Sequence, residues 1–401
     1  MGDRSRKLLA ALVLVSLVAG LGWHAVHDSA PSPAPSAPDV VPGAAGRPAN
    51  WPTPAARPRP GSAASGASAR AASEPGGQRQ AQGAQASGED EVPPEGIELC
   101  GVGRWTAEEI RQRGLPWLKA QMDRSMQQGD LALSRMASRL AAGTIRQQVA
   151  ARLVMSDVEG AALLAAGSQD ATAYQMALTS CGSPVHGPPG PQCQQLSIER
   201  WAALDPGDAR PWLRLLVRAV SQRDEAAADA ALAQVASRTQ LSAGSFLLES
   251  QVAPIASMEP DGLAREHALV KVIGIDAAAV GFDMAGLSRA CDVKHPAYSR
   301  RLPHCRAAAA RLLAASHDLM DASFAQAVAA RVGVPAAAQA HNAATLQAAM
   351  DAFAEEAGGA VGFDCQSAGR MHRFSERRAA EGELGLALSL LRDRQAREAK
   401  P

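Results

Sequence analysis

The pattern of hydrophobic and polar positions divides this chain into three parts. Residues 1–27 contain a largely apolar run at 8–26 behind a basic start. Residues 28–96 are rich in Pro, Ala, Ser and Gly and show no apolar periodicity. Residues 97–401 repeat apolar positions at near-helical spacing between capping residues and helix breakers. The pattern predicts a membrane-inserting segment, a disordered linker and a folded domain, in that order.

Within the folded part, the capping residues predict where short helices begin. Thr106-Ala-Glu-Glu109 is a capping box, and Asp170, Asp208 and Asp224 each precede a helical segment. Runs in which apolar and polar residues alternate, as they do in a β-strand, are short throughout. We therefore expect an all-α fold in which helical hairpins stack into an array stapled by disulfides.

Composition supports helix-on-helix packing and narrows the function classes. Apolar residues make up 47% of the chain but aromatic residues only 3%, which argues against β-sandwiches and barrels. Forty basic and forty acidic residues cancel, so no face suited to nucleic acid is implied. Neither a phosphate-binding glycine loop nor a metalloprotease helix motif occurs. We expect no cofactor and no nucleic-acid partner.

The first 27 residues set the expected compartment. A basic flank followed by about 16–19 apolar residues is typical of an uncleaved signal-anchor or of a cleaved signal peptide. We prefer the anchor, because the small residues that cleavage requires fit poorly here. Both alternatives export the rest of the chain. The expected location is the inner membrane, with a single pass and the C-terminal domain in the periplasm.

All six cysteines lie in the part expected to be exported. An oxidising compartment makes disulfides the default, and six cysteines allow fifteen pairings. The residues are Cys100, Cys181, Cys193, Cys291, Cys305 and Cys365.

Spacing favours one of these pairings. Cys181 and Cys193 bracket a proline-rich loop between helical segments, and Cys291 and Cys305 bracket a second loop that contains Pro303. We predict two local staples, each fastening an αα-hairpin. The remaining Cys100 would then bond to Cys365 and tie the start of the domain to its late part.

A metal site is the competing interpretation of the second loop. Cys291, His295, His304 and Cys305 supply four soft ligands. However, His304 and Cys305 are adjacent, and neighbouring residues seldom both reach one tetrahedral ion. Export also favours oxidation over thiolate ligation. We therefore expect no metal.

One segment is similar to a known repeat. Ala202–Leu216 followed by Asp224–Ala236 resembles a tetratricopeptide-type repeat, over about 35 residues. The matching packing positions are Trp212, Leu215, Ala228 and Leu232. The resemblance implies a stacked helical array that serves as a protein-binding scaffold. An ordinary αα-hairpin with the same spacing is the alternative.

A more degenerate repeat unit is expected upstream. A helix from Trp117 to Gln128 would end at Gly129-Asp130, which would form the turn to a second helix reaching Leu140.

A second resemblance concerns chemistry. In Phe246–Ser257, the positions of Glu249, Ser250, Pro254 and Ala256 are similar to the catalytic motif of lytic transglycosylases, although the Met-Gln pair that should follow is missing. The resemblance implies that Glu249 acts as general acid on a glycosidic bond. The alternative places Glu249 on the solvent-facing side of a helix that ends before Pro254.

The last helical segment, Ser375–Gln395, mixes charge with a stripe of leucines. We predict a final capping helix, and a helix that binds a partner is the alternative. The function expected from the whole sequence is non-enzymatic: a membrane-anchored envelope protein whose helical domain binds or scaffolds a protein partner. The alternative is a cell-wall glycan-cleaving enzyme that uses Glu249.

Overall fold

The fold is described from a computed structural model, and the description covers six stretches of the chain. They are residues 96–100, 103–183, 188–279, 283–336, 339–360 and 364–399. The predicted anchor at 1–27, and the predicted linker at 28–96 except its last residue, lie outside the described residues. Among the described residues, no helix combines the length and the apolar character needed to cross a membrane.

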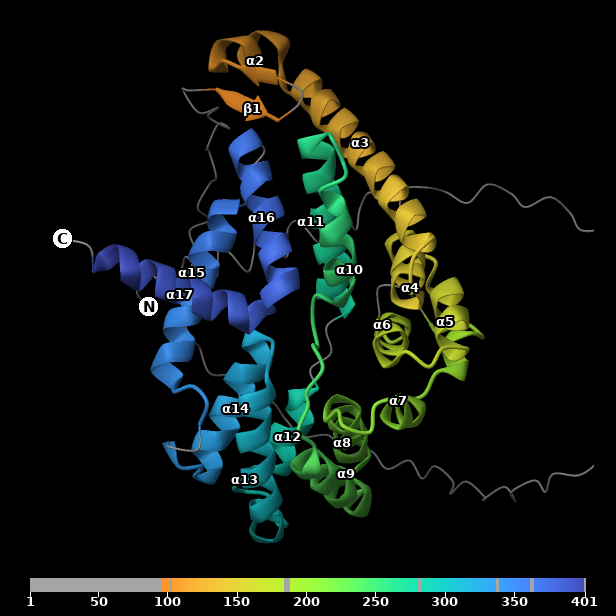
Figure 1. The fold of residues 1–401 in the computed structure, drawn as a ribbon, viewed down its shortest axis with the longest axis vertical. Helices are drawn as coiled ribbons and strands as arrows, with labels where there is room; N and C mark the ends of the chain where they lie inside the picture. The colour runs from red at the N-terminus through yellow and green to blue at the C-terminus, as the bar shows by residue number, and fades with distance from the viewer. Residues whose placement is uncertain are drawn as a thin grey trace, which may run out of the picture. The chain divides into compact units, whose positions relative to one another are not determined.

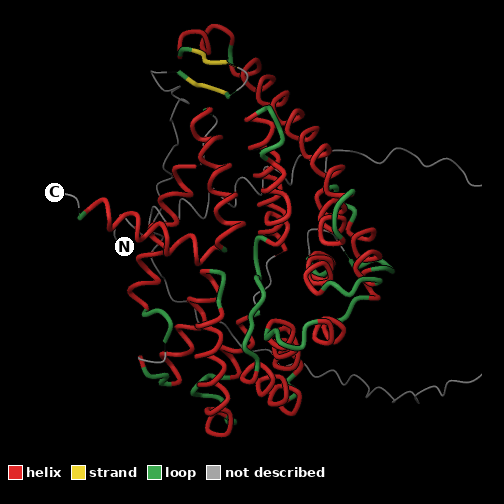
Figure 2. The backbone as a smooth tube through the Cα atoms, in the orientation of Figure 1, coloured by secondary structure: helices red, strands yellow, loops and turns green. Residues whose placement is uncertain are grey.

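The described chain is mostly helical, which confirms the prediction of an all-α fold (Figures 1 and 2). The first half contains β1 (Ile97–Leu99), β2 (Gly103–Trp105), α2 (Ala107–Arg113), α3 (Leu115–Ala141), α4 (Ile145–Val154), α5 (Val158–Ala166), α6 (Ala171–Cys181), the 3₁₀ turn η2 (Cys193–Gln195), α7 (Ile198–Leu204), α8 (Arg210–Gln222) and α9 (Glu225–Ser237). The second half contains α10 (Leu247–Ala256), α11 (Gly262–Ala279), α12 (Met284–Ala290), α13 (Tyr298–Ala315), α14 (Leu319–Val332), α15 (Ala343–Ala360), α16 (Cys365–Glu381) and α17 (Glu383–Glu398).

The two strands were not predicted. They pair antiparallel, with Ile97 opposite Trp105, and each has three residues. So short a segment carries no alternation that a sequence pattern could reveal.

Most of the predicted helix starts are confirmed. The Thr106 hydroxyl accepts from the Glu109 amide at 3.2 Å, and the Glu109 carboxylate accepts from the Thr106 amide at 2.9 Å. Asp170 and Asp224 also cap their helices. Asp208 does not occupy the N-cap position of α8, which Ala209 holds, although the Asp208 carboxylate accepts from the Arg210 amide at 3.0 Å as well as from Ser242.

Two hydrophobic cores organise the helices. We call one the N-terminal core; it is built from α3–α7 together with α10 and α11. We call the other the C-terminal core; it is built from α8, α9 and α12–α17. The chain therefore leaves the N-terminal core at α8, returns to it at α10 and leaves again at α12. Since each core needs separate stretches of sequence, neither is a continuous domain.

The α10–α11 pair lies between α3 on one side and α16 on the other (Figure 1). Gly129 shows how closely α11 and α3 approach: a Cβ at this position would lie 2.5 Å from the Cβ of His267. The prediction that Gly129-Asp130 ends a helix is wrong, because α3 runs through both residues. This glycine provides room for a neighbouring helix rather than a turn.

Three further boundaries differ from the predictions. Pro303 lies inside α13 rather than in the loop before it, and Pro254 lies inside α10. The predicted helix Ser375–Gln395 is divided at Gly382, whose φ of 73° is in the left-handed region that favours glycine. The leucine stripe thus belongs to a separate helix, α17.

The structure contains three disulfides, and they join the same cysteine pairs that the spacing favours. Cys181 bonds to Cys193, Cys291 to Cys305, and Cys100 to Cys365. The first two close short loops, although Cys305 lies within α13 rather than at its start. The third spans 265 positions and joins the turn after β1 to the first residue of α16.

Candidate functional site

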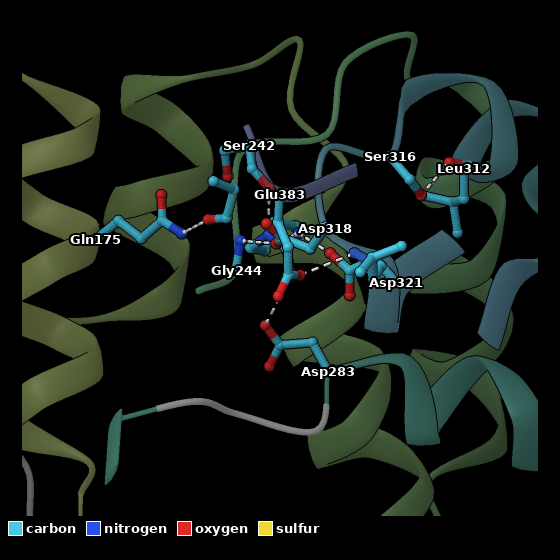
Figure 3. Close-up of polar contacts among 12 residues, drawn as sticks. Gln175, Ser242, Gly244, Asp283, Leu312, Ser316, Asp318, Asp321 and Glu383 are labelled. Carbon is cyan, nitrogen blue, oxygen red and sulfur yellow. Dashed lines mark hydrogen bonds and ion pairs between the residues drawn. The ribbon is translucent and has the colours of Figure 1, made fainter. Parts of the chain in front are cut away.

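A buried arginine joins the helices at the crossing between the two cores. Arg210, at the start of α8, is 1% exposed. Its guanidinium pairs with Asp321 and lies 3.6 Å from an oxygen of Asp283 and 3.7 Å from one of Asp318. Asp318 and Asp321 come from the start of α14, and Asp283 precedes α12 (Figure 3). One side chain thus holds three elements together.

The same arginine fixes the segment that leads from α9 to α10. Its Nε donates to the backbone carbonyl of Ser242 at 2.6 Å. Asp208 accepts from the amide and the hydroxyl of Ser242 at 2.9 and 2.6 Å. Asp318 accepts from the Gly244 amide at 2.6 Å, and Gln175 donates to the carbonyl of Ala243 at the same distance (Figure 3). The connection between the cores is therefore held by buried hydrogen bonds.

We call Arg210 and its polar neighbours the Arg210 cluster. Its members are Asp208, Arg210, Ser242, Asp283, Asp318 and Asp321. Burial alone would lower the pKa of the Arg210 guanidinium, but the surrounding carboxylates outweigh that effect and raise this pKa. Burial, and then the proximity of Asp321, raise the pKa of Asp318 against the opposing effect of Arg210.

The carboxylate proposed for catalysis, Glu249, lies inside the protein. It is 1% exposed and pairs with Arg378 of α16, which is 7% exposed. The Arg378 guanidinium lies 3.8 Å from the ring centroid of Phe246 and 5.0 Å from that of Phe374. The expectation that Glu249 faces solvent is wrong, since α16 covers this side of α10.

The backbone next to Glu249 is held by a second buried acid. Asp276 of α11 accepts from the amides of Leu248 and Glu249, at 3.0 and 2.7 Å, and so caps the start of α10. Burial raises the pKa of Asp276 to about 7. The helix propensities of the sequence do not reveal such a cap, because the amides that donate lie on α10 and the carboxylate that accepts lies on α11.

The side chain of Glu249 has almost no surface open to solvent. A cavity of about 20 Å³ has Leu248 and Asp276 among its lining residues but not Glu249. That volume holds about one water molecule. A general acid must come within hydrogen-bond reach of the bond it protonates. In this structure a glycan has no path to Glu249.

The remaining sequence hypotheses on chemistry concern metal ligands. Among the described residues, no group of three or more His, Cys, Asp or Glu side chains is arranged to hold a metal ion. Cys291 and Cys305 bond to each other, so neither offers a thiolate.

The repeat-like segment forms two packed helices, α8 and α9. Ala228 and Leu232 are buried between elements of the C-terminal core, as packing residues should be. Trp212 and Leu215 lie only partly buried at its edge, and Arg238 stacks on Trp212 at 5.5 Å. Leu213 and Leu216 take the fully buried positions instead. The resemblance to tetratricopeptide repeats stays a prediction.

A surface groove lies between α15 and α17, with a volume of about 600 Å³. Its lining residues are His341, Asn342, Ala344, Thr345, Ala348, Leu388, Leu391, Arg392 and Gln395. A lining that combines apolar and polar side chains is typical of a surface that binds a ligand or a peptide. No acidic residue lines it. We call it the α15–α17 groove.

Sequence reasoning found only half of this groove. Leu388 and Leu391 belong to the leucine stripe for which a partner-binding helix was the alternative interpretation. The α15 side, from His341 to Ala348, carried no signal, because alanines and short polar residues are common on any helix. Comparison with models of known protein families, with curated proteins and with solved structures gives no match.

Proposed function

We propose that this chain is a non-enzymatic, membrane-anchored binding protein of the cell envelope, and that its helical domain docks a protein partner in the α15–α17 groove. The groove is the observation that carries the proposal. It is large enough to accept several side chains of a partner, whereas the cavity lined by Leu248 and Asp276, next to Glu249 in the chain, is about 20 Å³.

The chemistry of the groove indicates the kind of segment that fits. Ala348, Leu388 and Leu391 offer apolar lining, which we call the apolar floor, where α15 and α17 pack against each other. Such a floor suits the apolar face of a partner helix or of an extended peptide. Arg392 and His341 favour a carboxylate beside those apolar residues.

The expected compartment agrees with the covalent structure. All six cysteines of the chain are bonded in pairs, as is usual in oxidising compartments. The predicted anchor at 1–27 and linker at 28–96 would hold the domain near the membrane while leaving it free to meet a partner.

Photo-crosslinking in intact cells tests the proposal. A photoreactive amino acid replaces Leu388 in the full chain, and in a matched control it replaces Leu163, an exposed leucine of α5 in the N-terminal core. We expect a protein adduct of defined mass from position 388 but not from 163, and expect it to disappear with Arg392→Glu. Adducts from neither position, or equally from both, would overturn the proposal.

A further inference from the structure

One covalent bond joins the start of α16 to the turn after β1. Cys365 opens the helix and bonds to Cys100. The apolar contact beside this bond is small: Cys100, Leu263 and Ala368 form a cluster of their own, separate from both hydrophobic cores. Apolar burial therefore contributes little to holding this end of the helix.

The rest of the contact between α16 and the α10–α11 pair, which we call the α16 interface, combines an apolar contact of Ala379 with the N-terminal core and several buried polar groups. Among the described residues, nine buried side-chain atoms lack a hydrogen-bond partner, and six of them are on these three helices. The six are Glu249 Oε1, Arg265 Nε, Glu266 Oε2, His372 Nδ1, Ser375 Oγ and Arg378 Nε. Each of these six atoms is buried without a hydrogen bond to the protein, although Glu249 and Arg378 pair with each other through other atoms. A buried polar atom without a partner weakens the packed state relative to an opened one.

Glu266 shows how burial of a carboxyl group disfavours the packed α16 interface. It is 4% exposed on α11, and burial, then the proximity of Asp364 at the start of α16, raise its pKa to about 7. Opening the interface would return this carboxyl group to water. The free energy of hydrating the Glu266 carboxyl group therefore favours separation of α16 from α11.

The disulfide at this end differs from the other two in access. Cys365 is an exposed residue, whereas Cys181, Cys193, Cys291 and Cys305 are all buried. Its partner Cys100 is 9% exposed, so we expect a thiolate to attack at Cys365, and exposed disulfides are the ones most readily reduced.

We propose that the Cys100–Cys365 disulfide is a redox latch that keeps α16 packed against α10 and α11, and that a dithiol reductant releases it. One thiolate of the reductant attacks Sγ of Cys365, and Cys100 leaves as a thiolate. The second thiolate of the reductant then displaces Cys365. Two protein thiols form, the reductant becomes a disulfide, and two electrons pass to the protein. This inference does not depend on the proposed partner groove.

A reductant titration of the full-length chain in detergent micelles tests the latch. Reduced dithiothreitol is the dithiol, alkylation with mass spectrometry reports each cysteine, and amide hydrogen exchange reports each helix. We expect Cys100 and Cys365 to be reduced at a dithiol concentration about tenfold lower than the other four cysteines. At that point, exchange in residues 365–375 should rise about tenfold while α13 and α14 remain unchanged.

Two variants sharpen the test. Cys100→Ser/Cys365→Ser should show the fast exchange of α16 without reductant, and Cys181→Ser/Cys193→Ser is the matched control that should not. If the first variant does not fold, the titration of the wild-type chain still decides. Simultaneous reduction of all three disulfides, or reduction of Cys100–Cys365 without faster exchange in α16, would overturn the proposal.

Discussion

The Arg210 cluster and the α16 interface are built from the same kinds of residue but differ in how completely their buried polar atoms are hydrogen-bonded. Each places a buried arginine among carboxylates where two groups of helices meet. In the Arg210 cluster, no buried side-chain atom of its six members lacks a partner, because serine and backbone groups complete the network. In the α16 interface, six atoms lack one. Completeness of hydrogen bonding, rather than the presence of an ion pair, separates a rigid junction from a weak one.

The largest effect is expected from Arg210→Met. The change leaves Asp318 and Asp321 buried without their cation, whereas Asp283 keeps Arg214 at 3.1 Å. Breaking such a cluster costs about 3–5 kcal/mol. Urea unfolding of the full chain measures the free energy of unfolding. Arg218→Met is the matched control, because the pair of Arg218 with Glu199 is solvent-exposed and contributes less than about 1 kcal/mol. Equal losses for the two variants would contradict the comparison.

A smaller loss is expected from Glu249→Gln. The glutamine keeps the shape but removes the anion that pairs with Arg378, so we expect a loss of about 1–3 kcal/mol in the free energy of unfolding. If Glu249 were a general acid instead, the wild-type chain would cleave purified peptidoglycan and this variant would not. We expect no cleavage by either chain.

The pH dependence of stability distinguishes the buried acids of α11 from an acid whose pKa is lowered. Burial raises the pKa of Asp276 and Glu266 to about 7 in the folded state, above the values near 4 of the unfolded chain. Their contribution is therefore fully present below pH 4 and is lost as pH rises toward 7. We expect the melting temperature to fall between pH 5 and 8, and to fall less in Asp276→Asn and in Glu266→Gln.

Glu259 provides the control of opposite sign. A hydrogen bond from Arg135 lowers its pKa, so its contribution is present above pH 4.5 and is lost as the pH falls through the lowered value. Glu259→Gln should change the acid limb of the stability curve and leave the limb between pH 5 and 8 as in the wild type. A steeper decline between pH 5 and 8 in Asp276→Asn would contradict our assignment.

The smallest effects are expected from two serines. The Ser375 hydroxyl is fully buried in the α16 interface without a partner, so Ser375→Ala should change the free energy of unfolding by less than about 0.5 kcal/mol, or raise it. The Ser242 hydroxyl donates to Asp208, so Ser242→Ala should cost about 1 kcal/mol. Urea unfolding at one pH compares the two. Equal costs would mean that both hydroxyls are equally satisfied.

The sequence predicted features that depend on near neighbours in the chain. Helical periodicity, the capping box at Thr106 and the caps at Asp170 and Asp224 all act within one or two turns, so their signals are local. The two short cysteine loops are also local, and once they are paired only one partner is left for Cys100. These features suffice for the all-α fold class and for the pairs of cysteines found in the structure.

Contacts between distant parts of the chain decided where one helix continues, which side chains are buried and where the groove forms. Gly129 could end a helix or let another helix approach, and only His267 of α11 determines which. Glu249 could face water or the interior, and Arg378, 129 positions later, determines its burial. The α15–α17 groove requires two helices that no local pattern pairs. Burial and electrostatic environment are set by the neighbours that the fold supplies, so a residue's type and spacing alone do not reveal its role.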